Sequence, residues 1–405
     1  MSTATAGLRG ELTQAARRAP VGALTRSGII ALVLGGAAWV WALMGGRADR
    51  AWEGYHTSFL YFTGIAQALV VFAATQKAAR SHWAGLIIRL AEAGVAFVVI
   101  APVLYLGLVL GRGHLFAVLP TDRPQVGFWF GQTFYLVRNW VLLAFMGWLS
   151  WRFVRRDMAA DIQELAEGRP VESDAAEKLR ISRAAVQLIV AWAFCYSLLA
   201  FDLIMSLAPR WVSNLFGAFF FMGNFLGALA TLAVLMLTLR GPLGIKDKVS
   251  TKQIHDLGKL VFGFTVFWAY LMWAQFLVIW YGNLPEETYW VFYRLWGGWR
   301  VIGTAVFLMV FVTPFLGLLG ARPKKYPPTF AGFALVSLAG LWLERYLEIV
   351  PSLNNGHGPA LGVPEIGAAV MLLGVFLLTY AAFARRYPMV SPRLAADTLE
   401  REHSH

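Results

Sequence analysis

The sequence predicts an all-α, polytopic membrane protein with about ten transmembrane helices. Of its 405 residues, 58% are hydrophobic, and the mean hydropathy is +0.58. Charged residues make up only 14% of the chain, whereas soluble domains carry about 25%. The basic residues that produce the net charge of +12 lie mostly in short loops between apolar runs. This distribution indicates membrane topology rather than nucleic-acid binding.

Ten apolar runs approach or exceed the roughly 20 residues that a spanning helix needs. The first follows four arginines without a signal-peptide cleavage site, so we expect it to act as an uncleaved anchor. The third, fourth, fifth and ninth runs each carry at least one charged residue. In chain order, the predicted spans cover residues 28–45, 57–75, 84–110, 128–151, 184–206, 215–239, 258–281, 301–320, 329–349 and 365–385.

The loop charges predict the orientation of these helices. The loops on the side that holds the N-terminus contain 25 lysines and arginines, and the opposite loops contain seven. Because basic loops stay in the cytoplasm, both termini are expected there. The prediction is a cytoplasmic segment 1–27, a membrane domain 28–385 and a cytoplasmic tail 386–405. In the longest loop, 152–183, residues 157–167 are expected to form a short surface helix.

One internal similarity suggests a duplicated four-helix unit. The fifth predicted span ends with an acid, Asp202, seven residues before Pro209, and the ninth with Glu344 seven residues before Pro351. Internal repeats are common in membrane proteins of this size. Repeat-like bundles are therefore expected at about 55–206 and 215–350, with chance similarity as the alternative.

Apart from the charged residues in the first or last two positions of the seventh and tenth spans, seven charged residues fall inside the predicted spans, where insertion of each costs about 2.5–3.5 kcal/mol. Such residues persist only if they are paired, line a wet cavity or take part in function, so they are the best candidates for a functional site. They are Arg89, Glu92, Arg138, Asp202, Glu344, Arg345 and Glu348.

These residues form two predicted groups. Arg89 and Glu92 share a helix face near the cytoplasm, as a proton half-channel or as a structural ion pair. The others lie toward the periplasm, where Glu344 and Glu348 also share a face. Asp202, Glu344 and Glu348 are candidate proton acceptors or relay groups. The structural alternative pairs Arg138 with Asp202 and Arg345 with Glu348.

Several kinds of site have no support in the sequence. The single cysteine, Cys195, excludes a cysteine-ligated iron–sulfur cluster and a haem attachment motif, and is expected to be a buried apolar residue. No histidine falls inside a predicted span, so a membrane haem held by two histidines is not expected. No nucleotide or metal motif appears. His56, at the periplasmic face, is expected to be a solvated loop residue or, alternatively, a proton acceptor at the edge of a pocket.

Five motifs in and around the fifth to seventh predicted spans resemble a known family. They are residues 201–211 (FDLIMSLAPRW), 213–223 (SNLFGAFFFMG), 256–260 (DLGKL), 267–270 (FWAY) and 279–288 (IWYGNLPEET). Together they resemble the NrfD/polysulfide-reductase-type integral membrane subunits, and most closely the smaller such subunit of bacterial alternative complex III.

The resemblance implies two four-helix bundles with peripheral helices, in the bacterial inner membrane. It implies a complex that oxidises menaquinol or ubiquinol and reduces a periplasmic cytochrome or an oxidase. Iron–sulfur and c-type cytochrome subunits would hold the redox centres, beside a larger sister subunit that has the better-supported quinol site. The smaller subunit would bind quinone, conduct protons or act as a scaffold.

The site residues follow from this resemblance. Asp202 falls in the family's FDxxMSL motif, and Glu344, Arg345 and Glu348 occupy the analogous end of the ninth span. Arg138 matches an arginine expected in the middle of the fourth span, although the surrounding segment 132–139 departs from the family pattern. The predicted quinone-binding residues are Arg138, Asp202 and Arg345, together with His56, which is a candidate because of its predicted place at the periplasmic face. A secondary transporter and a ligand-free scaffold remain as alternatives.

Overall fold

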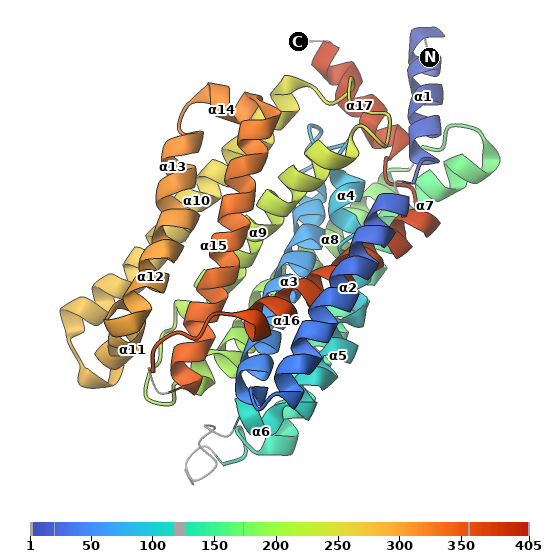
Figure 1. Cartoon of the computed structure of the whole chain (residues 1–405). Helices are drawn as coiled ribbons and strands as arrows, with labels where there is room; N and C mark the ends of the chain where they lie inside the picture. The colour runs from blue at the N-terminus through green and yellow to red at the C-terminus, as the bar shows by residue number, and fades with distance from the viewer. Residues whose placement is uncertain (1–2, 20, 117–126, 173, 355–356, 404–405) are drawn as a thin grey trace.

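The computed structural model describes residues 3–19, 21–116, 127–172, 174–354 and 357–403, and these residues form helices and connections without a β-strand (Figure 1). The α-helices in the first half are α1 (Thr3–Ala16), α2 (Val21–Met44), α3 (Ala48–Ala78), α4 (Ile88–Glu92), α5 (Val95–Leu110), α6 (Arg112–Leu115), α7 (Gln132–Glu167) and α8 (Ala175–Leu203).

The second half is also helical. It contains α9 (Phe216–Leu239), α10 (Thr251–Gly282), α11 (Pro285–Leu295), α12 (Arg300–Phe307), α13 (Thr313–Leu318), α14 (Ala321–Lys325), α15 (Pro327–Leu353), α16 (Val363–Arg386) and α17 (Pro392–His403), with 3₁₀ turns at Met205–Leu207 (η1) and Gly297–Trp299 (η2) and a π-helical turn at Leu308–Val312 (η3).

Eight of the described stretches are long and apolar enough to cross a membrane, which makes the chain a multi-pass membrane protein. Two further predicted spans correspond to α7 and α15, of 36 and 27 residues. Their charged residues lower their hydropathy, so the count of ten remains a prediction. The eight stretches are Gly7–Met44, Ala48–Ala78, Ile88–Leu110, Ala175–Leu207, Phe216–Leu239, Thr251–Gly282, Gly297–Leu318 and Val363–Arg386.

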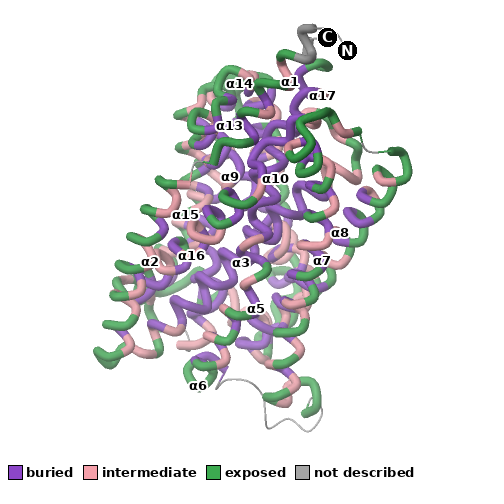
Figure 2. The backbone as a smooth tube through the Cα atoms, turned by 90° about the vertical axis from the view of Figure 1, so that its right-hand side faces the viewer, coloured by how far each residue is buried: buried purple, intermediate pink, exposed green. Residues whose placement is uncertain are grey.

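Helix α3 lies at the centre of the fold, and its most apolar stretch is completely buried (Figure 2). It contacts α5 and α8 on one side, and α9, α15 and α16 on the other. Helix α7 packs against α5 and α8, while α9 packs against α10 and α15. Large apolar side chains on the outer helices are exposed, as expected for surfaces that face hydrocarbon.

Both ends of the described chain lie at the same end of this bundle, beside α1 and α17 (Figure 1). We call it the termini end, and we call the opposite end, near α6 and α11, the far end. Helix α8 begins near the termini end behind its N-cap Asp174, whose side chain accepts a hydrogen bond from the Glu177 amide. It ends at the far end, where Asp202 lies.

Helices α2 and α16 pack closely through glycines. Gly28 and Gly35 on α2 face Leu378 and Met371, while Gly374 on α16 faces Leu32. A Cβ atom at Gly35 would overlap the backbone of Met371. Small residues let membrane helices approach in this way, because helix association in lipid depends on close packing and not on hydrophobic burial.

The structure corrects two predictions. Helix α7 is continuous to Glu167, so residues 157–167 are helical as predicted, but they extend the preceding helix instead of forming a separate surface helix. Helix α3 begins at Ala48 instead of residue 57, which places His56 inside the helix. His255 also lies inside a helix, α10. The prediction that no histidine falls within a spanning helix is therefore wrong. Cys195 is buried, as expected.

Candidate functional site

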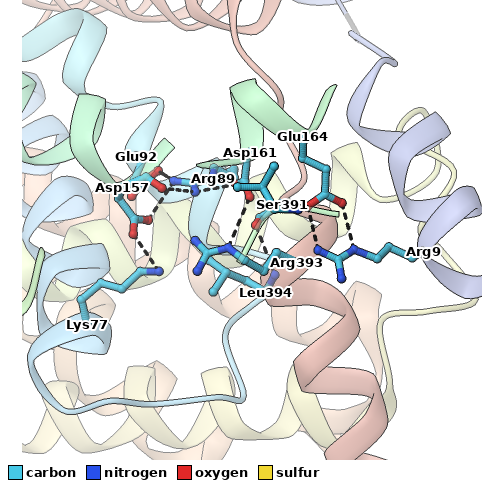
Figure 3. A network of polar contacts seen from close by, with 11 residues as sticks. Arg9, Lys77, Arg89, Glu92, Asp157, Asp161, Glu164, Ser391, Arg393 and Leu394 are labelled. Carbon is cyan, nitrogen blue, oxygen red and sulfur yellow. Dashed lines mark hydrogen bonds and ion pairs between the residues drawn. The ribbon is translucent and has the colours of Figure 1, made fainter. Parts of the chain in front are cut away.

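Arg89 is the centre of a buried cluster of charges near the termini end (Figure 3). Its guanidinium donates hydrogen bonds to Glu92, to Asp157 Oδ2 at 2.9 Å and to Asp161 Oδ2 at 2.6 Å. It also donates to the Asp157 backbone carbonyl at 3.0 Å. All four of these side chains are almost completely buried. The predicted contact between Arg89 and Glu92 is present, but it is one part of a larger network.

Three more cations complete this network. Lys77 Nζ lies 2.9 Å from Asp157 Oδ1, and Arg393 Nε lies 3.8 Å from Asp161 Oδ1. Arg9 donates two hydrogen bonds to the Glu164 carboxylate, at 2.9 and 2.7 Å. Four cations therefore lie opposite four carboxylates. Burying charged groups costs free energy, and pairing each with an opposite charge offsets that cost. We call this set the terminal charge network; it comprises Arg9, Lys77, Arg89, Glu92, Asp157, Asp161, Glu164 and Arg393.

The network joins helices that are far apart in the sequence. Asp157, Asp161 and Glu164 are spaced four and three residues apart, so they lie on one face of α7. That face meets α4 through Arg89, and α1 through Arg9. These three acids were not among the predicted site residues, because they fall in a highly charged stretch that was expected to form a helix at the membrane surface. Their helical spacing was the signal that could have identified them.

At the far end, Arg138 and Asp202 form the pair that the structural interpretation predicted. Arg138 Nε lies 2.8 Å from Asp202 Oδ2, and Nη2 lies 2.9 Å from Oδ1. The guanidinium also donates to the Trp129 carbonyl at 2.9 Å and lies over the Trp129 ring. This is a bidentate arginine–carboxylate contact, the strongest common geometry for such a pair. It fixes α7 to the C-terminal end of α8.

Three more polar side chains lie near this pair, and two of them have polar atoms without a hydrogen-bond partner in the described structure. The Tyr135 hydroxyl donates to the Asp202 carbonyl. Among the residues that the structure describes, the Tyr105 hydroxyl and both ring nitrogens of His56 make no hydrogen bond, although both side chains are buried. The His56 ring lies close to the backbone of Leu203, the residue after Asp202. The expectation that His56 is a solvated loop residue is therefore wrong.

A second far-end cluster lies on α15. Arg345 Nη1 is 2.5 Å from Glu348 Oε2, and Nη2 is 3.6 Å from Glu344 Oε2. Trp268 Nε1 donates to Glu344 Oε1 at 2.6 Å. Arg294 donates to the backbone carbonyl of Glu348 at 2.6 Å. Glu344 and Glu348 thus share a face, as predicted, and Arg345 is bound to both carboxylates.

The predicted site residues therefore fall into three groups. Arg89 and Glu92 belong to the terminal charge network, whereas Arg138, Asp202 and His56 lie together at the end of α8. Arg345 lies with Glu344 and Glu348 on α15. In the part of the chain that the structure describes, no direct hydrogen bond or ion pair joins a member of one group to a member of another.

A further cluster of charged residues, not predicted from the sequence, lies at the far end between α3 and α16. Arg50 makes two hydrogen bonds to the Glu365 carboxylate, at 2.7 and 2.9 Å, and Glu365 is completely buried. Glu53, one helical turn further along α3, is also buried. These residues were assigned to loops or span ends, because their polarity ends the hydrophobic runs there.

Outside the spanning helices, Asp397 on α17 is the clearest case of a perturbed carboxyl. Burial alone would raise its pKa, but hydrogen bonds from Arg401, at 3.0 Å, and from His82, at 2.6 Å, hold the pKa of Asp397 below its usual value. The pair with His82 attaches α17 to the segment that follows α3. It is about half exposed, so its contribution to stability is small.

Over the part of the chain that the structure describes, no group of three or more histidines, cysteines or carboxylates is placed to hold a metal ion. A comparison of the chain with protein-family models finds no match, and a comparison with curated proteins finds none either.

Proposed function

We propose that this chain is a membrane subunit of a respiratory quinol-oxidising complex and that it transfers protons between the two ends of its helix bundle. The motifs of residues 201–223 and 256–288 support the assignment to such a complex. The arrangement of buried carboxylates supports the role within it.

The observation that carries the proposal is that buried carboxylates with an unused oxygen atom occur toward both ends of the helical domain. Within the described structure, Glu92 Oε1 near the termini end has no hydrogen-bond partner, and neither have Glu344 Oε2 and Glu348 Oε1 toward the far end. Each carboxylate has an arginine beside it, which lowers the cost of the charged form. Carboxylates in this setting are typical of proton relays in membrane proteins.

The charge bias of the loops supports placing the termini end in the bacterial cytoplasm and the far end in the periplasm. Glu92 and Arg89 would then take up protons at the cytoplasmic end. Glu344 and Glu348 would transfer protons in the periplasmic half. Helices α3, α5, α7 and α8 contact one another, and so do α9, α10, α15 and the α12–α13 segment. These contacts support two four-helix bundles with α2 and α16 at the periphery.

Quinol binding at the far end is a second candidate function. Asp202, Tyr105 and His56 offer an acceptor and unpartnered polar groups at one place. A quinol ring needs apolar walls and a few polar groups that bind its hydroxyls. Arg138 would then orient the substrate, menaquinol or ubiquinol, and Asp202 would accept its proton. If the substrate bound instead at the separate cluster on α15, Arg345 would orient it. Electrons would pass to iron–sulfur and c-type cytochrome partners, beside a larger sister subunit.

The test uses the natively purified protein with whatever subunits accompany it. Quinol:cytochrome c turnover is measured for the wild type and for Glu92→Gln, Glu344→Gln and Asp202→Asn, with subunit content determined by mass spectrometry. Glu286→Gln is the matched control, because Glu286 is exposed in the first turn of α11. General acid–base groups contribute about 10²–10⁴-fold, so a large loss of turnover is expected for the first two variants.

The outcomes distinguish the alternatives. A loss confined to Asp202→Asn favours quinol binding at the far end over proton transfer through the bundle. Unchanged turnover in all three variants, with all subunits present, overturns both roles and leaves a ligand-free scaffold. Purification without any iron–sulfur or cytochrome partner overturns the respiratory assignment and makes a secondary transporter the leading function.

A further inference from the structure

A cavity of about 660 Å³ opens at the termini end, beside the terminal charge network. Its walls come from the C-terminal end of α3, the connection to α4, the first turns of α8, and α17. The walls combine charged side chains with apolar ones, including Leu179 and Ile181. Leu179 is 45% exposed, so part of the cavity rim is apolar.

Arg393 on α17 lines this cavity, and two of its donor atoms are not used. Its side chain is only 16% exposed, and the acceptor with which it pairs, Asp161 Oδ1, is 3.8 Å from Nε, beyond hydrogen-bond range. In the described structure, Nε and Nη2 are buried and have no hydrogen-bond partner. Buried polar groups are almost always satisfied by protein, water or ligand. A guanidinium with two unmet donors therefore indicates an acceptor with several oxygens.

Two further cations line the same cavity. Arg80 follows the end of α3, and Lys178 lies in the first turn of α8. Both residues are exposed, and neither has an ion-pair partner among the residues described. Three cations from three separate parts of the chain thus line one cavity, and none of them has a carboxylate within hydrogen-bond distance in the part of the chain that is described.

The acids that line the cavity do not neutralise these three cations. Asp157 is paired with Lys77 and Arg89, and Asp397 with Arg401 and His82. Glu172 and Glu400 are exposed to solvent, where their fields are screened. Within the described structure, Asp157 Oδ1 makes no hydrogen bond either, but it is ion-paired with Lys77 at 2.9 Å, so the buried charge of the lining that lacks a partner within hydrogen-bond range is the Arg393 guanidinium.

We propose that this cavity binds a phosphate group, with Arg393 as the main ligand and Arg80 and Lys178 as secondary ligands. The planar guanidinium matches two phosphate oxygens at once, and an ammonium adds charge without fixed geometry. Basic pockets beside membrane helices are typical sites for phospholipid head groups. The phosphate comes either from a phospholipid head group, whose acyl chains would lie along α8, or from free inorganic phosphate. This proposal is independent of the quinol assignment.

The experiment measures thermal unfolding of the natively purified, delipidated protein while three additives are titrated. They are dihexanoyl phosphatidylglycerol, dihexanoylglycerol, which lacks the phosphate, and sodium phosphate. The variants are Arg393→Gln and the double variant Arg80→Gln/Lys178→Gln, which alters only exposed side chains and so is expected to fold. Arg322→Gln/Lys325→Gln is the matched control, because these exposed cations lie on α14 at the same end.

The phospholipid is expected to raise the melting temperature of the wild type and of the control with saturation, and dihexanoylglycerol is expected not to do so. The concentration for half-saturation should rise about fivefold for each cation removed, hence about 25-fold for the double variant. A rise with sodium phosphate at the same concentrations identifies free phosphate as the ligand. No saturable rise with either phosphate compound, or an equal response of the double variant and the control, overturns the proposal.

Discussion

Arg138 and Asp202 are joined by two parallel hydrogen bonds of 2.8 and 2.9 Å, although they are 64 residues apart in the chain. Only 9% of the arginine side chain and 3% of the aspartate side chain are exposed. The contact connects the start of α7 to the end of α8. Because both charged groups are buried, each needs the other to offset the free energy lost with its hydration.

Arg138→Gln should therefore destabilise the protein strongly. Removing one partner of a buried pair typically costs about 3–5 kcal/mol, because the other charge stays buried without compensation. Asp202→Asn should cost less, since Arg138 keeps its contacts with Trp129. The double variant should recover part of the loss. Thermal unfolding of all four proteins in detergent measures the coupling, and additive effects would contradict it.

Arg89→Gln should be among the most destabilising single changes in the molecule, because Arg89 donates to three carboxylates at once. We expect a loss of about 3–5 kcal/mol. Arg89→Lys should rescue little, since an ammonium cannot reproduce the planar fork. Melting temperature is the readout. Arg169→Gln, in a pair where the arginine is 75% exposed, should stay within about 0.5 kcal/mol of the wild type.

Gly35→Ala should weaken the packing of α2 on α16. The added methyl group would overlap the backbone of Met371, so the helices must separate. Overpacking of this kind costs about 1–3 kcal/mol. Gly36→Ala is the control, because the new atom would meet only the Met371 sulfur at 3.9 Å. Equal melting temperatures for the two variants would show that the close approach is not required.

Acid should loosen the attachment of α17. The pKa of Asp397 is lowered in the folded protein, so its contribution is complete above the unfolded-state value of about 3.9 and is lost as pH falls through the folded value. The difference in stability between wild type and Asp397→Asn should hence decrease as the pH falls below about 4. Thermal unfolding across this range tests the sign. A difference that grows on acidification would contradict it.

The helices were largely predictable from the sequence, because runs of apolar residues determine where a chain can cross a membrane. The start of α3 was not, since residues 48–56 contain polar groups that end the hydrophobic run. The helix nevertheless continues there, because Arg50 finds a partner in Glu365 on α16. Hydropathy reports on the residues of one segment and contains no information about such distant partners.

The same limit applies to the candidate site. Pairs within one helix, such as Arg345 with Glu348, follow from helical spacing and were predicted. The pairing of Arg138 with Asp202 was predicted because both lie in spans that must neutralise their charges. Glu164 pairs with Arg9 on α1, and Asp161 pairs with Arg393 on α17 as well as with Arg89, so the network draws on both ends of the sequence. Only the assembled fold brings these helices together.

Arg9 and Arg393 lie near opposite ends of the chain but belong to one network. The network can therefore be completed only late in the synthesis of the chain. A ribosome adds about 5–20 residues per second, so Asp161 is made well before the arginine that pairs with it from α17. Until residue 393 has emerged, this carboxylate depends on Arg89 alone. Docking of α17 is therefore a late event of biosynthesis, and a nascent chain released before that point would expose the incomplete network to quality-control proteases.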